Sequence, residues 1–442
     1  MYYQNLEACE MLSTGICIHN CPYCYIPKSP EMARMHRRIC EYIKSGEFIT
    51  NIKEVYGEEL KHLGFWGTEP TLTLPLLQEK LPDIFAAFPK IESMDFSTSM
   101  MNKPIIIFNF INALRGKDFL LKFQISLDGP AFITDVNREI GAAKLIPENL
   151  KKLLKMVNEI DLGKLKIQMR WKPTLSIDNM TELNQGGNID LYIGYFEDIN
   201  KMFRDINKQE NFTLEEFYGP SLVVPGKYTS DDGKLLASFL KNYHERGRDG
   251  TYVGRVERLR SFHRELYKRR MFTCSGGDSN LGIGREIHIC HRTFYMNDDD
   301  YIDSILKTDI ENWDISLFKR KTIEMIKKYY IVDTADKDEL YRFFYVMRGR
   351  HDFWRLITSY NYGMMKELAL AGQVDPVYLK DDGLLETFSL FIAVGMDCPM
   401  ENLLNTGSMH ITPLSLLRLW GNGAFQEIMR RVGENEPRAT EC

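Results

Sequence analysis

The first 215 residues alternate between short apolar runs and helical stretches, and this alternation constrains the fold more than any other feature of the chain. The apolar runs have the length and composition of strands, and the stretches between them place apolar residues at helical spacing. Strand–helix alternation favours parallel βα units, arranged in a barrel or an open sheet. We expect strands at residues 62–66, 93–97, 121–127 and 165–171, and helices that include residues 31–44 and 147–159.

The rest of the chain changes character twice. With 442 residues the protein is too long for one small domain, so we expect two or three units. Residues 1–215 form the βα unit, and residues 216–305 contain prolines, glycines and short strand-like pieces. Residues 306–433 have a mainly helical pattern, and the polar residues 434–442 form a tail that we expect to be frayed and flexible.

Charge and hydropathy exclude several classes of protein. The net charge of −5 does not fit a globally basic nucleic-acid binder. No apolar run is long enough to predict a membrane span, and the amino terminus lacks the basic start and apolar core of a signal peptide. We therefore expect a cytoplasmic protein. In a compartment that keeps thiols reduced, its nine cysteines favour metal ligation over disulfides.

Three cysteines lie close together near the amino terminus. Cys17, Cys21 and Cys24 are separated by three and then two residues. A loop this short can wrap one face of an iron–sulfur cubane and ligate three of its four irons through thiolates. The remaining iron is then open to a substrate or cofactor. The alternative is a structural zinc site with His19 as a further ligand, although such sites usually use two separated pairs of ligands.

The spacing of these cysteines, with the aromatic Tyr23 before the last of them, resembles the signature of the radical S-adenosylmethionine (SAM) enzymes. The resemblance implies a [4Fe–4S] cluster on Cys17, Cys21 and Cys24, with Tyr23 among the residues that contact the cofactor. In that family the open iron chelates the amino and carboxylate groups of SAM. An electron donor such as flavodoxin or ferredoxin is implied, and electron transfer from the cluster cleaves SAM to a 5′-deoxyadenosyl radical that abstracts a substrate hydrogen.

Two downstream segments extend the resemblance. Gly67, Thr68 and Glu69 precede a proline at the end of a predicted strand, where the family carries Gly-Gly-Glu-Pro. The resemblance implies that these residues contact the ammonium group of SAM, although threonine replaces the second glycine. Ser97 and Ser99 follow the next predicted strand, where related enzymes place hydroxyl or amide groups near the SAM ribose.

A third segment resembles the peptide-modifying branch of the family. It reads Ser126-Leu127-Asp128-Gly129 and is followed by Arg138. The resemblance implies that Ser126 and Asp128 bind ribose hydroxyls and that Arg138 pairs with the SAM carboxylate through its planar fork of donors. These motifs fall at predicted strand ends, where barrel enzymes collect their functional residues. The family implies a partial (β/α)6 TIM barrel for residues 1–215, with a gap that admits a large substrate.

A later pair of cysteines, within residues 216–305, resembles the first half of the SPASM or twitch domain, a small α+β unit that binds auxiliary [4Fe–4S] clusters in peptide-modifying relatives. Cys274 and Cys290 flank a glycine-containing hairpin, but the further cysteines of a complete domain are missing. One auxiliary cluster would take Cys398 as a candidate third ligand. The candidates for its fourth ligand are His288, His291, Cys9, Cys442 or a substrate atom. The alternative is that Cys274 and Cys290 are free or paired thiols without iron.

The motifs together favour an enzyme that modifies a peptide or protein side chain by crosslinking, thioether formation, epimerisation or oxidation, as in the maturation of ribosomally made peptides. A radical SAM enzyme acting on a sugar, nucleoside or amino acid is the second hypothesis, because twitch-type relatives use small substrates too. A cluster-bearing sensor or binding protein without turnover is the third. No motif places a catalytic acid or base.

Overall fold

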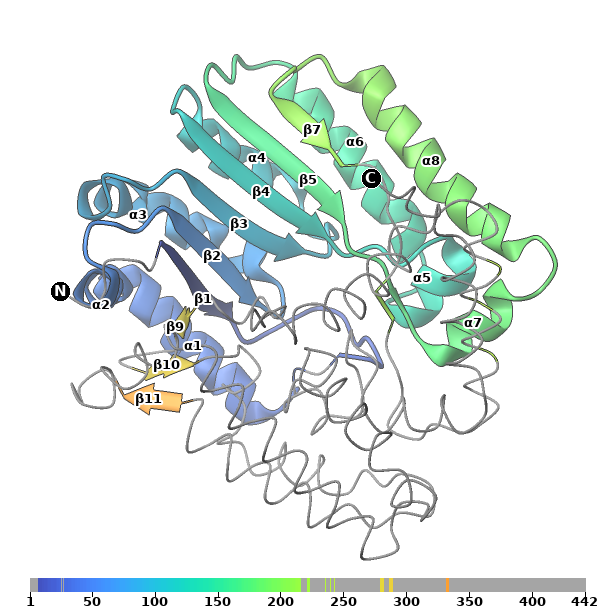
Figure 1. Ribbon diagram of the computed structural model, residues 1–442, viewed down its shortest axis with the longest axis horizontal. Helices are drawn as coiled ribbons and strands as arrows, with labels where there is room; N and C mark the ends of the chain where they lie inside the picture. Colours follow the sequence, from blue (N-terminus) through green and yellow to red (C-terminus); the bar gives the residue numbers. More distant parts are fainter. Residues whose placement is uncertain are drawn as a thin grey trace, which may run out of the picture.

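A large, mostly parallel sheet forms the centre of the computed structural model, which describes residues 7–24, 26, 28–215, 221–222, 235, 239, 242, 279–281, 286–288 and 331–333 (Figure 1). Within these residues the strand order is β11-β10-β9-β1-β2-β3-β4-β5-β7. Six neighbouring strands run parallel in chain order. They are β1 (Ala8–Thr14), β2 (His62–Gly67), β3 (Ser93–Thr98), β4 (Phe119–Ile125), β5 (Leu165–Trp171) and β7 (Phe212–Leu214).

Short strands from later in the chain extend this sheet beyond β1. Strand β9 (Ser279–Leu281) pairs in parallel with β1, and β10 (Glu286–His288) and β11 (Ile331–Asp333) continue in antiparallel pairing. Two more short strands, β6 (Thr174–Leu175) and β8 (Ser221–Leu222), form a separate parallel pair. A segment far along the chain therefore lies beside the first strand.

Helices connect the parallel strands, and Figure 1 shows α3, α4 and α6 behind the sheet. The helices are α1 (Pro30–Ser45), α2 (Glu47–Tyr56), α3 (Leu74–Ala87), α4 (Pro104–Leu114), α5 (Ala131–Asn137), α6 (Ala142–Val157), α7 (Ile177–Leu183) and α8 (Asn188–Ile206), with a 3-10 turn η1 (Pro70–Thr73). The α/β architecture of parallel strands with intervening helices, expected from the sequence, is confirmed.

One face of the sheet carries the hydrophobic core. Phe65, Phe96 and Phe123 are cross-strand neighbours on β2, β3 and β4, and all three are buried. Their rings stack, with centroids 4.9 Å apart between Phe65 and Phe96 and 5.7 Å apart between Phe96 and Phe123. Phe110 of α4 meets Phe96 edge to face at 5.3 Å. Each such aromatic pair adds about 0.5–1.5 kcal/mol of stability beyond the burial of its surface. The contact between Phe110 and the stacked phenylalanines therefore holds α4 against the sheet.

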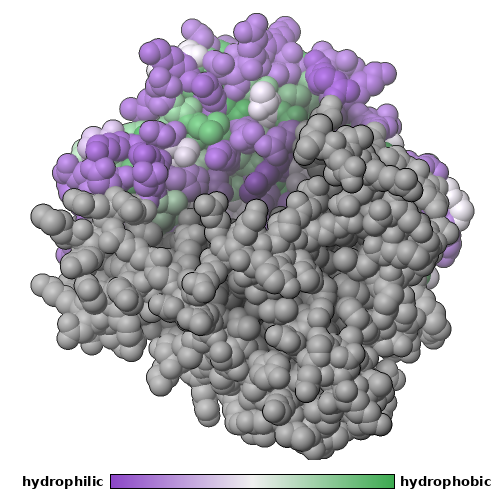
Figure 2. Space-filling model, viewed as in Figure 1, coloured by the Kyte–Doolittle hydropathy of each residue, from purple (hydrophilic) through white to green (hydrophobic). Residues whose placement is uncertain are grey.

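The opposite face of the sheet is polar and partly exposed. Its strand residues include His62, Asp95, Lys122 and Gln124, which alternate with the buried aromatic positions. Figure 2 shows that the described surface in this view is mostly hydrophilic, with a hydrophobic area among the polar side chains. With α3, α4 and α6 behind one face and polar strand residues on the other, the sheet is consistent with the partial (β/α)6 TIM barrel that the resemblance implies.

Two predicted boundaries shift in the structure. Strand β4 starts and ends two residues earlier than expected, so Ser126 lies just after the strand. Helix α6 begins five residues earlier than expected and contains Pro147 in its interior. Proline lacks the N–H that would bind the carbonyl four residues back, which is that of Ala143. The hydroxyl of Tyr195 on α8 donates to that carbonyl instead, which explains why the helix tolerates the proline.

The expected domains at 216–305, 306–433 and 434–442 fall almost entirely outside the described residues. They therefore remain predictions, as does the boundary at residue 215. No helix within the described part of the chain is both long and apolar enough to cross a membrane.

Candidate active site

The three predicted cluster ligands lie in the loop between β1 and α1. Gly15 opens this loop against the first turn of α1, where a Cβ atom would lie 2.5 Å from the carbonyl oxygen of Met32. Only glycine allows the chain to pass so close to the helix. At the other end, the Ser29 hydroxyl accepts the N–H of Met32 at 3.2 Å and Pro30 begins the helix. Both ends of the loop are thus fixed by α1.

Within the loop the three thiols differ in exposure. Cys17 and Cys21 are partly buried and Cys24 is exposed. The Cys24 N–H donates to the Cys21 carbonyl at 3.0 Å, and the His19 N–H donates to Cys17 Sγ at 3.4 Å. Burial raises the pKa of Cys17, and burial raises the pKa of Cys21 to about 11 although the nearby Arg138 opposes that shift. A cation bound at the loop would therefore be needed to hold these groups as thiolates at neutral pH.

A buried carboxylate connects this loop to the carboxyl end of β4. Asp128 is fully buried, and its Oδ2 accepts the Tyr23 hydroxyl at 2.6 Å. Its Oδ1 accepts Nη2 of Arg138 and the N–H of Thr174, at 2.8 Å and 2.9 Å. Nη1 of Arg138 points to Cys21 Sγ at 4.0 Å. The cysteine loop, the end of β4 and the start of β6 are joined through one side chain.

Two asparagines support this network. The amide of Asn137, next to Arg138 in the sequence, donates to Asn179 Oδ1 at 2.8 Å and lies 3.4 Å from Asp128 Oδ2. Burial raises the pKa of Tyr23, with the Asp128 charge adding to the effect, so Tyr23 stays a hydrogen-bond donor at neutral pH. Sequence reasoning missed Thr174 and Asn179, because a main-chain N–H and a helix-capping asparagine carry no motif.

Glu69 forms a second buried cross-link, between the ends of β2 and β3. It is 1% exposed, and its carboxylate accepts the Thr98 hydroxyl at 2.8 Å. It also accepts the N–H and hydroxyl of Ser99, at 2.8 Å and 2.6 Å, and the hydroxyl of Thr71. Thr98 and Ser99 thus face Glu69, whereas Ser97 lies within β3 and is partly exposed.

The turn after β2 touches the cysteine loop. Gly67 has φ of +138°, and a Cβ there would lie 2.4 Å from the carbonyl oxygen of Thr14, so a side chain is excluded. The Thr68 hydroxyl donates to the carbonyl of Ile16 at the start of the loop. After β4, the N–H of Ser126 donates to the Thr98 carbonyl at 2.7 Å. The structure therefore brings the predicted residues of β2, β3 and β4 to one edge of the sheet beside the cysteines.

The three cysteines, with His19 and Arg138 beside them, form a set of side chains that fits an iron–sulfur cluster and a polar ligand bound to it. Both ring nitrogens of His19 and Nε of Arg138 are buried without a hydrogen-bond partner among the described residues. His19 Nδ1 lies 3.5 Å from Glu139, which is too far for a good hydrogen bond, and burial lowers the His19 pKa. Within the described chain, the three cysteine sulfurs do not form a group that lies within 4.8 Å of one another.

The candidate auxiliary ligands are mostly untested by the structure. Cys274, Cys290 and Cys398 lie outside the described residues, as do His291 and Cys442. His288 is buried in β10, with Nε2 3.4 Å from Glu286, and Cys9 is fully buried in β1. Cys9 is thus in the core position that a small apolar side chain prefers.

No protein-family model matches the chain, and no curated protein matches it. Among solved structures it is similar to polyhistidine-tagged anSMEcpe with bound AdoMet, at a TM-score of 0.43 and 12% identity over 98% of this chain and 96% of that one. Native anSMEcpe with bound AdoMet gives 0.38 and 15%, over 64% and 74% of the two chains. SuiB of Streptococcus suis, bound to its precursor peptide SuiA, gives 0.33 and 15%, over 66% and 61%. These likenesses are distant and assign no activity to this chain.

Proposed function

We propose that this chain is a radical SAM enzyme whose [4Fe–4S] cluster is held by Cys17, Cys21 and Cys24. One observation carries the proposal. Tyr23 of the cysteine loop and Arg138 after α5 both donate to the buried carboxylate of Asp128, at the carboxyl end of β4. Residues far apart in the sequence thus meet at the edge of a parallel sheet where α/β enzymes place their sites.

In this proposal Cys17, Cys21 and Cys24 would hold the cluster, which would supply an open iron for SAM and the electron for its cleavage. The residues of the chain itself bind SAM and orient it. Asp128 takes Nη2 of Arg138 and Nη1 points to Cys21 Sγ, so Nε is the donor left to face the carboxylate of SAM. Ser126 offers its hydroxyl to the ribose, and the turn of Gly67 and Thr68 offers main-chain oxygens to the ammonium group. Glu69 and Ser99 hold that turn against the end of β3.

The proposed substrate is a peptide or protein side chain. Its support is the Ser-Leu-Asp-Gly segment followed by Arg138, which resembles the peptide-modifying branch, and the hairpin pattern of Cys274 and Cys290. An auxiliary cluster on Cys274, Cys290 and Cys398, a flavodoxin or ferredoxin as electron donor, and a cytoplasmic location belong to the same proposal.

The iron content of cysteine variants tests the cluster. After anaerobic reconstitution we expect about four irons and four sulfides at the loop, and a loss of both in Cys17→Ala, Cys21→Ala and Cys24→Ala. Cys40→Ala, in α1 and outside the loop, is the matched control and should keep them. The measurement is best made in a chain lacking Cys274, Cys290 and Cys398, so that only the iron and sulfide bound at the loop are counted. Full iron content in the loop variants, or uptake of a single zinc ion in place of iron, would contradict the proposal.

The mass of a candidate peptide tests the substrate class. Enzyme with cluster, SAM and reductant should change the mass of a peptide encoded beside its gene. Unchanged peptide together with strong 5′-deoxyadenosine formation would instead favour a small-molecule substrate. If no reductant yields 5′-deoxyadenosine, the chain is a cluster-bearing sensor or binding protein.

A further inference from the structure

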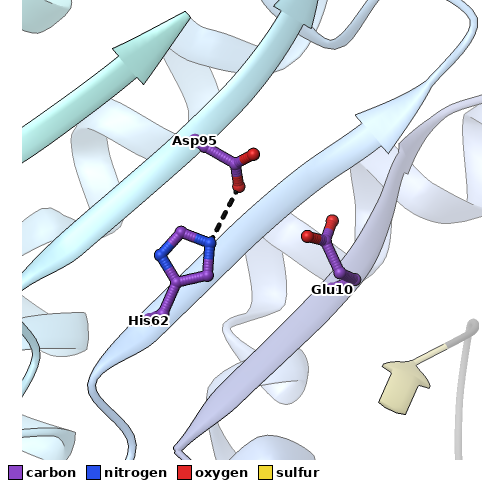
Figure 3. Close-up of side chains that lie close together, drawn as sticks. All are labelled: Glu10, His62 and Asp95. Atoms are coloured by element: carbon purple, nitrogen blue, oxygen red, sulfur yellow. Dashed lines mark hydrogen bonds and ion pairs between the residues drawn. The ribbon is translucent and has the colours of Figure 1, made fainter. Parts of the chain in front are cut away.

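A second group of side chains with metal-binding chemistry lies on the polar face of the sheet, away from the cysteine loop. Glu10 of β1, His62 of β2 and Asp95 of β3 come from three neighbouring strands and lie close together (Figure 3). One ligand atom of each lies within 4.8 Å of the others. We propose that these residues form a binding site for one divalent metal ion.

The space between the two carboxylates is kept open by a glycine. Gly64 lies between Glu10 and Asp95 in the strand register. A Cβ atom on Gly64 would lie 2.4 Å from Glu10 Oε2 and 2.6 Å from Asp95 Oδ1. Both carboxylates therefore lean over the glycine from opposite sides.

The imidazole of His62 is held as in a metal ligand. Its Nδ1 lies 2.8 Å from the hydroxyl of Ser93, its direct partner on β3, and its Nε2 lies 3.1 Å from Asp95 Oδ1. If Nδ1 donates to Ser93, Nε2 and the carboxylate oxygen are both acceptors, and a proton or a cation must lie between them. Two ligands about 2.1 Å from a metal and at right angles to it lie about 3.0 Å apart, which matches this spacing.

The donor set indicates the class of ion. One imidazole and two carboxylates suit first-row divalent ions such as Mn²⁺, Fe²⁺ or Zn²⁺, whereas a thiolate site selects softer metals. The side chains of His62 and Asp95 are 23% and 28% exposed, so an ion can enter and keep water ligands. Its three residues lie three to five positions before the carboxyl ends of β1, β2 and β3, so the site is separate from the cysteine loop.

Mn²⁺ is the probe of choice, because it favours oxygen and nitrogen ligands over thiolates. The full-length chain carrying Cys17→Ala, Cys21→Ala and Cys24→Ala is titrated with Mn²⁺, and the free ion is followed by its EPR signal. We expect one bound ion per chain. His62→Gln and Asp95→Asn should weaken binding at least tenfold, and Ser93→Ala, which releases the imidazole, should weaken it by about 10–100-fold.

Gly64→Ala is the sharpest variant, because it adds one methyl group at the centre of the site and removes no ligand. Because this methyl group fills the space between the carboxylates, Gly64→Ala should abolish Mn²⁺ binding. Circular dichroism checks that the variant chain is folded. Asp118→Asn, at an exposed carboxylate before β4, is the matched control and should bind as the parent does. No Mn²⁺ bound at millimolar concentration, or equal binding in His62→Gln, Asp95→Asn and Gly64→Ala, would overturn the proposal and leave a His62–Asp95 ion pair.

Discussion

At the scale of single residues, Asp128 decides the geometry of the candidate active site. Its carboxylate is fully buried and accepts donors from Tyr23, Arg138 and the N–H of Thr174. The side chain of Arg138 is itself only 7% exposed. A buried charge pair of this kind is costly to break, because removing one partner leaves the other without compensation in a poorly solvated site.

We therefore expect Asp128→Asn to lower the free energy of unfolding by about 3–5 kcal/mol, measured by urea denaturation of the metal-free chain. Tyr23→Phe removes one hydrogen bond to a charged group and should cost less, about 1.5–3 kcal/mol. The exposed Asp118→Asn is the control and should change little. If Asp128→Asn is as stable as that control, the network does not hold the cysteine loop.

The sequence predicts which residues meet at this site better than it predicts what each one touches. The motifs of Cys21, Glu69 and Arg138 place these residues at loop and strand ends, and the structure brings them to one edge of the sheet. The resemblance assigns Glu69 and Asp128 to SAM, yet both carboxylates also accept several donors from the protein. Those donors depend on tertiary contacts between strands, which no local pattern encodes.

At the scale of elements, α6 shows how a local signal misplaces a boundary. The spacing of apolar residues predicts a helix over residues 147–159, with Pro147 in the first turn, where proline is common. The structure begins α6 at Ala142, because the carbonyl left without its helical N–H partner accepts the Tyr195 hydroxyl from α8. The compensating residue is 48 positions away in the sequence, which is why sequence periodicity alone does not find it.

A double-mutant cycle tests this compensation. Tyr195→Phe should cost about 1 kcal/mol of unfolding free energy, because the Ala143 carbonyl loses its donor. In a Pro147→Ala background the new N–H can bind that carbonyl, so the same change should cost almost nothing. The expected coupling between the two positions is about 1 kcal/mol by urea denaturation. Additive effects would show that the Tyr195 hydroxyl does not replace the missing helical hydrogen bond.

At the scale of the whole molecule, the two faces of the sheet differ in their surroundings. The face with Phe65, Phe96 and Phe123 packs against helices, and the other face carries polar, partly exposed side chains. The four strands predicted from apolar runs are confirmed, because their alternation is local. The three-residue strands β7 and β9 lie beyond such a prediction, since their place in the sheet comes from pairing with distant strands.

We propose that the cysteine loop holds a cluster that cleaves SAM. Its most direct test is the amount of 5′-deoxyadenosine released when the anaerobically reconstituted, reduced chain is mixed with SAM. We predict release by the wild-type chain and by Cys40→Ala, and none above background by Cys21→Ala. No release from a wild-type chain loaded with iron and sulfide, or equal release from Cys21→Ala, would contradict the account.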